Sequence, residues 1–298
     1  MVLGIGGGGD VVGALASALL CERLGTPAVL GGVTWERRVV DELPGPRSPS
    51  EIVDATPLAE AVMLAGPETR TREGAVFAEA HMARFREEST VLVDVNQGPS
   101  VIADGLEQAA LALETDLFVL VDVGGDVLGD GSEPGLASPL CDAVMLAAGT
   151  LLARRGARVV AAVFGPCCDG ELTIEELLDQ LARLAGAGGL VGVEGMPAEV
   201  ADTLERASME IPTEASAQAI RCAHGEIGVT SIRAGRRQVQ LSPIGAMTFY
   251  FDPEIAVASV AQLAQAVIDA EDLEAANGSL HHLGITTELD YERSFTER

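Results

Sequence analysis

Residues 117–133 read LFVLVDVGGDVLGDGSE, an apolar run that ends abruptly in glycines and carboxylates. A run of Val and Leu without polar alternation is typical of a strand buried on both faces of a parallel sheet. Open α/β sheets bind ligands at the carboxyl ends of such strands, and Gly124 and Gly125 allow close approach of a ligand. The stretch therefore predicts a small-molecule site at the sheet edge that includes Asp122 and Asp126. The alternative is a loop that serves only as scaffold.

Strands and helices are predicted to alternate on both sides of this stretch. Besides 117–121, strands are expected at 1–5, 28–33, 90–93 and 157–164, and helices at 11–24, 101–114, 139–154 and 173–185. This alternation predicts an α/β fold, a Rossmann-like, open, mostly parallel sheet with helices on both faces, over residues 1–190. Residues 34–74, rich in Pro, Gly and charge, are expected to form a long excursion over the sheet edge.

The pattern changes after the glycine-rich segment 185–195. Helices are expected near 197–208, 214–223 and 254–268, around a strand pair at 228–232 and 238–241 joined by a turn. This predicts a smaller α+β extension, residues 191–280, packed on the core. The polar stretch 281–298 is typical of a disordered tail.

Composition restricts the partners of the protein. The 298 residues carry a formal net charge of −26, which disfavours nucleic acid and anionic membrane surfaces. All 19 basic residues are arginine, so the chain has no lysine for Schiff-base or P-loop chemistry. No secretory signal precedes the five cysteines, and we expect a cytoplasmic protein, a homo-oligomer, whose partner is a small-molecule substrate.

The first glycine-rich segment, Gly6, Gly7, Gly8 and Gly9, satisfies G-x-G-x-x-G when read from Gly4. Placed between a strand and a helix, such a loop can hold a phosphate or ribose with its amides and the helix dipole. The alternative is a tight turn that merely needs small residues. A nicotinamide cofactor is disfavoured, because Glu36 lies late for a ribose-binding acid and Asp10 would repel a pyrophosphate.

Further polar residues follow other predicted strands. Trp35, Glu36 and Arg37 could stack on and grip a substrate, or anchor an interface. Asp94 and Asn96 are expected on a strand adjacent to that of Asp122, where they would bind Mg²⁺, Ca²⁺ or sugar hydroxyls, or form Asx turns. Four more residues complete the candidate substrate site: Glu133, Ser138, Asp169 and Glu171. Ser138 is most simply a helix N-cap, and Cys167 and Cys168 small apolar residues or a reactive thiol.

In combination, these segments resemble the DUF1152 family, an uncharacterised group of archaeal and bacterial proteins. The resemblance rests on Gly6–Asp10, Trp35–Arg37, Pro44–Pro46, Gly124–Glu133, Ser138–Leu140 with Asp142, Asp169–Glu171, Pro212–Ser216 and Phe249–Asp252. It implies an α/β, enzyme-like protein and supplies no reaction.

The leading functional hypothesis is a hydrolase or transferase acting on a ribosylated or phosphorylated metabolite. Asp94, Asp122 and Asp126 would form a carboxylate cluster in which one side chain activates water, and Asp122 and Asp126 would hold Mg²⁺ or Ca²⁺. The Asp-rich strand end is similar in style to nucleoside hydrolases, which cleave N-glycosidic bonds with an aspartate-bound Ca²⁺. The alternatives are an NAD(P)-dependent oxidoreductase and a non-enzymatic ligand-sensing protein.

Overall fold

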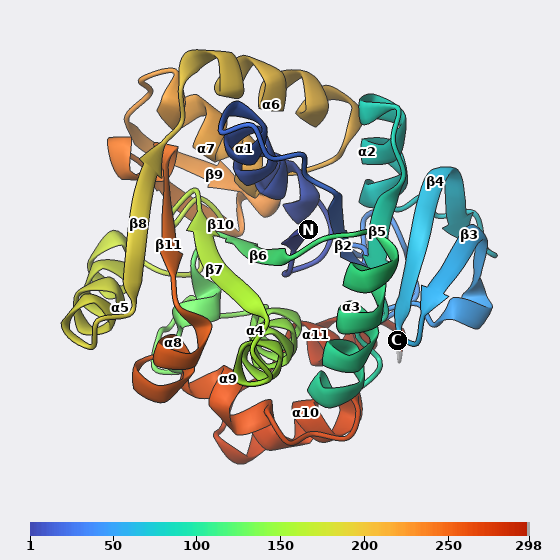
Figure 1. Cartoon of the computed structure of the whole chain (residues 1–298). Coiled ribbons are helices and arrows are strands. Elements are labelled where there is room, and N and C mark those ends of the chain that lie inside the picture. The colour runs from blue at the N-terminus through green and yellow to red at the C-terminus, as the bar shows by residue number, and fades with distance from the viewer. Residues whose placement is uncertain (297–298) are drawn as a thin grey trace.

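The computed structural model describes residues 1–296 and shows an α/β protein built on one large mixed sheet (Figure 1). Nine strands lie in the order β3-β4-β5-β2-β1-β6-β7-β11-β8. Their bounds are β1 Val2–Gly4, β2 Leu30–Val33, β3 Ile52–Ala59, β4 Val62–Thr71, β5 Thr90–Val93, β6 Leu117–Val123, β7 Arg158–Phe164, β8 Leu190–Gly195 and β11 Met247–Phe251.

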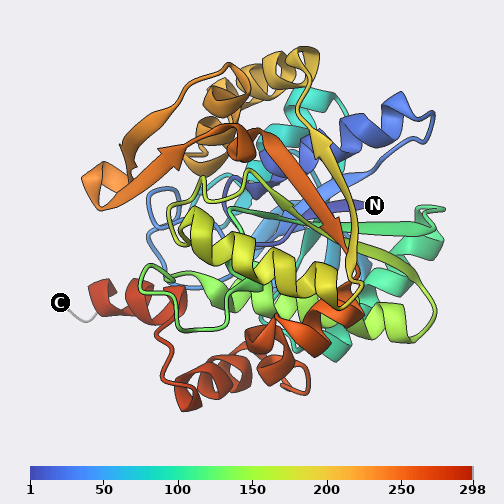
Figure 2. The same ribbon diagram turned by 90° about the vertical axis from the view of Figure 1, so that its left-hand side faces the viewer.

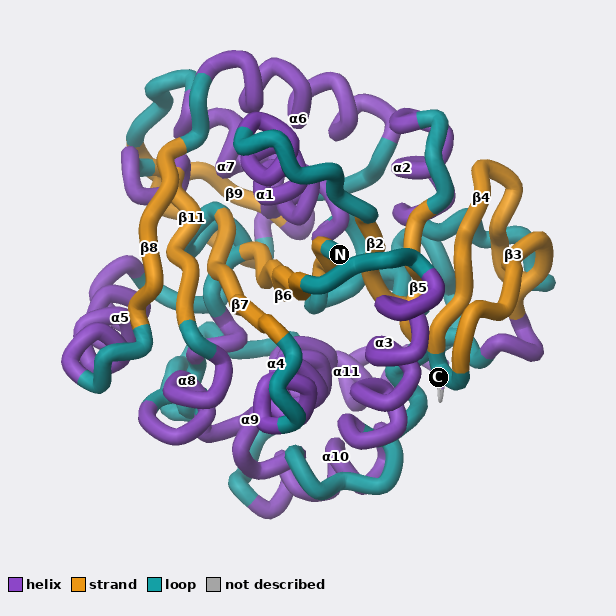
Figure 3. The backbone as a smooth tube through the Cα atoms, viewed as in Figure 1, coloured by secondary structure: helices purple, strands orange, loops and turns teal. Residues whose placement is uncertain are grey.

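The strands of this sheet, orange in Figure 3, are parallel at its centre and antiparallel on its two sides. Strands β5, β2, β1, β6 and β7 all run in the same direction. On one side β4 pairs antiparallel with β5 and β3 with β4. On the other, β11 pairs antiparallel with β7 and β8 with β11. A separate antiparallel pair, β9 Gly228–Ile232 and β10 Arg237–Leu241, forms a hairpin outside the sheet.

Helices cover both faces of the sheet and divide the core into two large apolar clusters. One face carries α1 Asp10–Arg23, α2 Ala78–Arg86, α6 Ala198–Glu210 and α7 Ala215–Ala223, above the sheet in Figure 1. The other carries α3 Pro99–Ala112, α4 Pro139–Arg154, α5 Ile174–Gly186, α8 Pro253–Ser259, α9 Gln262–Val267, α10 Leu273–His282 and α11 Glu288–Thr296. Among the described residues, no helix combines the length and hydropathy needed to cross a membrane.

Two long segments differ from the sequence-based expectation. Residues 34–74 do not only pass over the edge, because β3 and β4 within them extend the sheet. Within the expected extension at 191–280, β8 and β11 are strands of the same sheet. β8 and β11 pair with strands far away in the sequence, and strand pairing of this kind leaves little local signal.

The polar end of the chain is helical rather than a disordered tail up to residue 296. Residues 281–282 finish α10, and α11 follows. Leu289, Glu288 and Glu292 are buried, so α11 is held by side chains that enter the protein. Residues 297–298 lie outside the described residues.

Candidate functional site

Loops that follow four neighbouring parallel strands meet at one edge of the sheet. They are Gly6–Asp10 after β1, Thr34–Arg37 after β2, Asp122–Asp126 at the end of β6 and Gly165–Glu171 after β7. The chain runs from β1 to β2 on one side of β1 and later enters β6 on the other side. The loops after β1 and β6 therefore diverge at this point, which leaves a crevice position between them.

One group of three carboxyl groups lies at this position. Asp10 begins α1, Asp122 ends β6, and Asp142 lies in the first turn of α4. All three are buried, and one oxygen from each lies within 4.8 Å of the other two. Asp142 Oδ1 has no hydrogen-bond partner among the described residues. A buried carboxyl oxygen without a partner is costly unless a ligand contacts it.

Gly6 lies directly against this group. Its amide donates a 3.0 Å hydrogen bond to Asp10 Oδ2. A Cβ at this position would lie 2.6 Å from Asp10 Oδ2 and 2.8 Å from Asp142 Oδ2. The residue must therefore be glycine for the carboxyl groups to come this close.

A second group is formed by Asp126, Asp169 and Glu171, again within 4.8 Å of one another and buried. Neither oxygen of Asp169 has a hydrogen-bond partner among residues 1–296. Gly124, at φ +128°, turns its Cα toward Asp169, where a Cβ would collide with the carboxyl group. This conformation strongly favours glycine.

Glu171 differs from its neighbours because it is fully partnered. It accepts hydrogen bonds from the amides of Ala137 (2.7 Å) and Ser138 (2.9 Å) and from Ser138 Oγ. Arg237 Nη1 lies 2.6 Å from Glu171 Oε1. Ser138 thus helps to hold the carboxylate of Glu171 in place.

Burial and mutual repulsion raise the pKa of most of these carboxyl groups. Desolvation is the largest cause throughout, followed by neighbouring carboxylates for Asp122, Asp126 and Asp142, whose pKa values lie well above the usual range. Desolvation raises the pKa of Asp10 to about 6 and, together with repulsion by Glu171, that of Asp169 to about 7. For Glu171, Arg237 and the hydrogen bonds outweigh desolvation and lower the pKa. A cation is the natural partner of such a set.

The glycine loop uses part of its own amides internally. Gly6 N donates to Asp10, and Gly8 N donates 2.8 Å to the carbonyl of Trp35. The side chain of Arg37 lies on the loop, so that a Cβ at Gly8 would be 2.6 Å from Arg37 Cγ. The loop is therefore an incomplete cradle for an anion, and positive charge beside it comes from arginine.

The expectation that Asp94 and Asn96 adjoin Asp122 was wrong. β2 and β1 lie between β5 and β6 in the sheet. Asp94 Oδ1 accepts hydrogen bonds from Asn96 N (2.9 Å) and Asn96 Nδ2 (2.8 Å), and this Asx arrangement forms its local turn. The sequence order of strands did not reveal their spatial order, because the crossover to the other side of β1 is set by packing.

Three other candidates already have hydrogen-bond partners within the protein. Trp35 is 4% exposed and donates through Nε1 to Glu292 of α11, 3.1 Å away. Glu36 accepts a 2.5 Å hydrogen bond from the amide of Ala78 at the start of α2. Glu133 accepts from the amides of Asp130 (3.0 Å) and Gly131 (2.9 Å) in its own loop.

Three residues that contact this region were not predicted from the sequence, namely Asp142, Glu288 and Arg237. Asp142 had a signal, because it lies in the first turn of a helix that starts beside the Asp-rich loop. Glu288 of α11 accepts hydrogen bonds from the amides of Leu140 (3.1 Å) and Cys141 (2.9 Å) at the N-terminus of α4. Its position depends on tertiary packing of a segment that looked like a tail.

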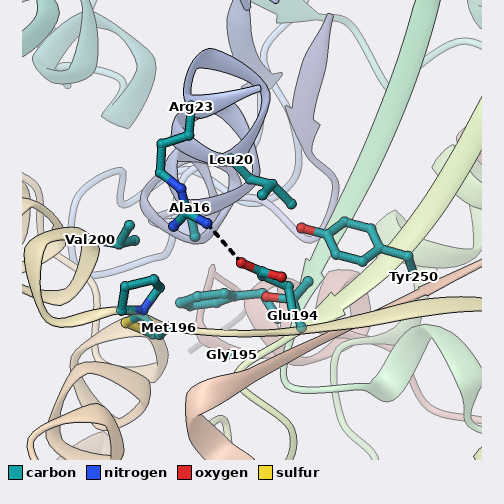
Figure 4. Close-up of a pocket in the computed structure, with 11 residues that line it drawn as sticks. Ala16, Leu20, Arg23, Glu194, Gly195, Met196, Val200 and Tyr250 are labelled. Atoms are coloured by element: carbon teal, nitrogen blue, oxygen red, sulfur yellow. Dashed lines mark hydrogen bonds and ion pairs between the residues drawn. The ribbon is translucent and has the colours of Figure 1, made fainter. Parts of the chain in front are cut away.

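A shallow hollow elsewhere on the surface does not belong to this site (Figure 4). It lies beside the C-terminal half of α1, away from Asp10 at the start of the same helix. Arg23 and Glu194 form an exposed ion pair of 2.9 Å across it, and Tyr250 lines its side. It contains none of the buried acidic groups described above.

A single family model covers all of the residues of the candidate site. A family model described as "Protein of unknown function (DUF1152)" matches residues 1–296. The chain belongs to the DUF1152 family. No curated protein and no solved structure matches it. The resemblance predicted from the glycine loop, Asp126 and Asp169–Glu171 is therefore confirmed. Because the family description names no function, a proposal for this DUF1152 protein has to be argued from the carboxyl groups.

Proposed function

We propose that this DUF1152 protein is a cation-dependent hydrolase or transferase that acts on a ribosylated or phosphorylated small metabolite. One observation carries the proposal: two buried groups, each of three acidic side chains, contain carboxyl oxygens without a hydrogen-bond partner. These oxygens belong to Asp142 and Asp169. Buried acids of this kind are stable when a divalent cation binds them. Oxygen-only ligands favour Mg²⁺, Mn²⁺ or Ca²⁺ over softer metals.

The strand order supports a ligand at this place. Numbered along the chain, the five parallel strands are arranged 3-2-1-4-5, as in doubly wound, Rossmann-like sheets. Such sheets bind ligands between the first and fourth of these strands, here β1 and β6. Asp10 and Asp122 stand at the carboxyl ends of that pair.

Different acidic residues would bind the cation, accept a proton and hold the site in place. Asp10, Asp122 and Asp142 form one cation-binding group, in which a bound cation supplies Lewis-acid chemistry. Asp169, whose pKa is raised to about 7, is suited to accept a proton from water near neutral pH. Glu171 stays ionised and, with Arg237 and Ser138, holds the second group in place.

The nicotinamide alternative is less well supported by the geometry. The carboxylate of Glu36 is buried and occupied by the amide of Ala78. A dinucleotide site needs a free acid at this strand end for the ribose. The carboxyl groups beside Gly6 would also repel a pyrophosphate that no cation bridges.

Thermal unfolding with and without divalent cations tests the proposal. We expect Mg²⁺, Mn²⁺ or Ca²⁺ to raise Tm relative to chelator, since a cation at about a hundred times its Kd stabilises by about 2.7 kcal/mol. Asp122→Asn imitates the protonated acid, so it should fold normally and lose the cation effect. Asp94→Asn, outside both groups, is the matched control and should keep it.

A screen for turnover follows with nucleosides, nucleotides and sugar phosphates, measuring released sugar and phosphate. Activity that requires a cation and is lost in Asp122→Asn supports the enzyme proposal. Absence of any cation effect on Tm, together with metal-free purified protein, would contradict it. Ligand binding by the wild type, with no turnover of any nucleoside, nucleotide or sugar phosphate, would favour the sensing alternative.

Self-association is a separate proposal with its own support. β8 is an edge strand of the sheet, and its side chains Val191 and Val193 are 62% and 48% exposed. Exposed apolar edge strands pair readily with another chain. Light scattering after size exclusion would show a homo-oligomer, and Val193→Lys should dissociate it.

A further inference from the structure

Three arginines from two distant segments gather beside the glycine loop. Arg37 follows β2, and Arg233 and Arg237 belong to the β9–β10 hairpin. After desolvation, repulsion by Arg37 and Arg237 is the largest cause that lowers the pKa of Arg233, to about 10. Despite desolvation, nearby carboxyl groups, Asp10 and Glu171 foremost, offset part of this repulsion and raise the pKa of Arg37.

The guanidinium group of Arg37 has no partner of its own. Among residues 1–296 it donates no hydrogen bond, and no carboxylate oxygen lies within the 4.0 Å of an ion pair. Its side chain is half-buried against Gly8, with a Cβ at that glycine 3.0 Å from Arg37 Nε. An arginine has five donors in a planar fork. Those of Arg37 are free for a ligand.

The two hairpin arginines are only partly occupied. Arg237 Nη1 contacts Glu171 Oε1 at 2.6 Å and the carbonyl of Asp169 at 3.4 Å. Arg233 Nε lies 3.5 Å from Glu214 Oε2. Arg237 thereby places the arginine cluster next to the acidic group formed by Asp126, Asp169 and Glu171.

We propose that Arg37, Arg233 and Arg237 bind a phosphoryl group of the substrate, which makes a phosphorylated metabolite the substrate class. This inference rests on the proposed function above. Guanidinium groups bind phosphate oxygens in pairs, and a phosphoryl group has enough oxygens to contact arginines on one side and a cation on the other. The amides of Gly6 and Gly8 already donate hydrogen bonds within the protein, so they are not available to a phosphate. The arginines would supply the missing donors.

The hairpin that carries two of these arginines lies over the site. Figure 2 shows the β9–β10 hairpin (orange) and α11 (red) on the same side of the molecule, with the loops after β6 and β7 between them. The Arg236 guanidinium donates to the hydroxyl of Tyr291 in α11 and to the carbonyl of Arg233, and it bonds to none of the buried acidic groups. Arg236 is therefore a matched control on the same hairpin.

Isothermal titration with inorganic phosphate, in saturating Mg²⁺, tests the proposal. We expect Arg37→Gln and Arg233→Gln each to weaken phosphate binding by about ten- to a hundredfold, the worth of a charged hydrogen bond. Arg37→Lys keeps the charge without the fork and should bind with intermediate affinity. Arg236→Gln should bind like wild type. Unchanged phosphate affinity in the Gln variants would overturn the inference. If one variant folds poorly, the other decides the test.

Two further comparisons separate this inference from the proposed function. Equal affinity of wild type for ribose and ribose 5-phosphate would overturn the phosphoryl subsite, whereas the cation effect on Tm would still support the carboxylate site. Phosphate binding that depends on Arg37 without any cation effect would support the subsite and contradict the cation-dependent enzyme.

Discussion

The indole nitrogen of Trp35 donates a hydrogen bond of 3.1 Å to the carboxylate of Glu292, 257 positions later in the chain. The same carboxylate accepts a 2.8 Å hydrogen bond from the amide of Gly45. The loop after β2, which carries Arg37, is thereby joined to α11. The position of this loop beside the glycines depends on the last helix.

Removing the acceptor should therefore loosen the loop. Glu292→Ala leaves two buried donors unpaired, and we expect the free energy of unfolding to fall by about 1–3 kcal/mol for each of them. Trp35 is the only tryptophan, so its fluorescence reports water entry at this contact. Glu292→Gln keeps an acceptor and should be less affected. Equal stability of the Ala variant and wild type would show that the contact contributes nothing.

Gly6→Ala should remove cation binding while the protein remains folded. The added methyl would enter the space beside Asp10 and Asp142 and push the two carboxyl groups aside. Overpacking of this kind costs about 1–3 kcal/mol of stability. Gly192→Ala, which meets no atom within 4 Å, is the control. If the cation-induced rise in Tm persists in Gly6→Ala, the first group of carboxyls is not the cation site.

Stability without metal should fall as pH rises. Desolvation raises the pKa of Asp10 to about 6 and those of Asp169 and Glu288 to about 7. The folded state therefore holds protons that the unfolded chain releases near pH 4, so their stabilising effect is complete below that pH and disappears as pH rises through about 6–7. Each group contributes up to about 1.4 kcal/mol per pH unit in this window.

Urea unfolding in chelator at about pH 5 and about pH 8 measures this effect. Cations bind ionised carboxylates, so their stabilising effect should increase over the same window in which the metal-free protein weakens. Greater stability of the chelated protein at the higher pH would contradict the assigned directions.

Glu288→Gln should shift cation binding to lower pH. Burial and repulsion by Asp122 and Asp10 raise the pKa of Asp142, and Glu288 adds to this repulsion. A neutral side chain at residue 288 removes that contribution, so Asp142 ionises more readily. The midpoint of the cation effect on Tm, followed against pH, should fall. Some loss of stability is also expected, because an amide can accept from only one of the two donors, Leu140 N and Cys141 N.

The central strands could be predicted from the sequence because each carries its own signal. The apolar run before Asp122 and the glycines after β1 indicate buried strands that end in loops, and the structure has β6 and β1 there. The pairs β3–β4 and β8–β11 contain exposed and mixed residues. Their strand character comes from neighbours in space, which a single sequence does not reveal.

Some residues of the candidate site could likewise be predicted from the sequence, and others could not. Asp122, Asp126, Asp169 and Glu171 lie at or after the ends of two strands that are adjacent in the sheet, so residue type and position sufficed to predict that they lie at one sheet edge. Asp94 met the same criteria and lies elsewhere, because the spatial order of strands depends on where the chain crosses β1. Arg233 and Glu288 come from a hairpin and a terminal helix, whose docking has no local signature.

Because the loop after β2 is held by α11, it cannot reach its final position early in synthesis. A nascent chain can pair β1 with β2 and β6 long before residues 288–292 have been translated. Until then Trp35 lacks its acceptor and the start of α4 lacks Glu288. The protein therefore completes these contacts only after residues 288–292 have been translated, and a chain stalled before them should carry the sheet without the contacts of Glu288 and Glu292.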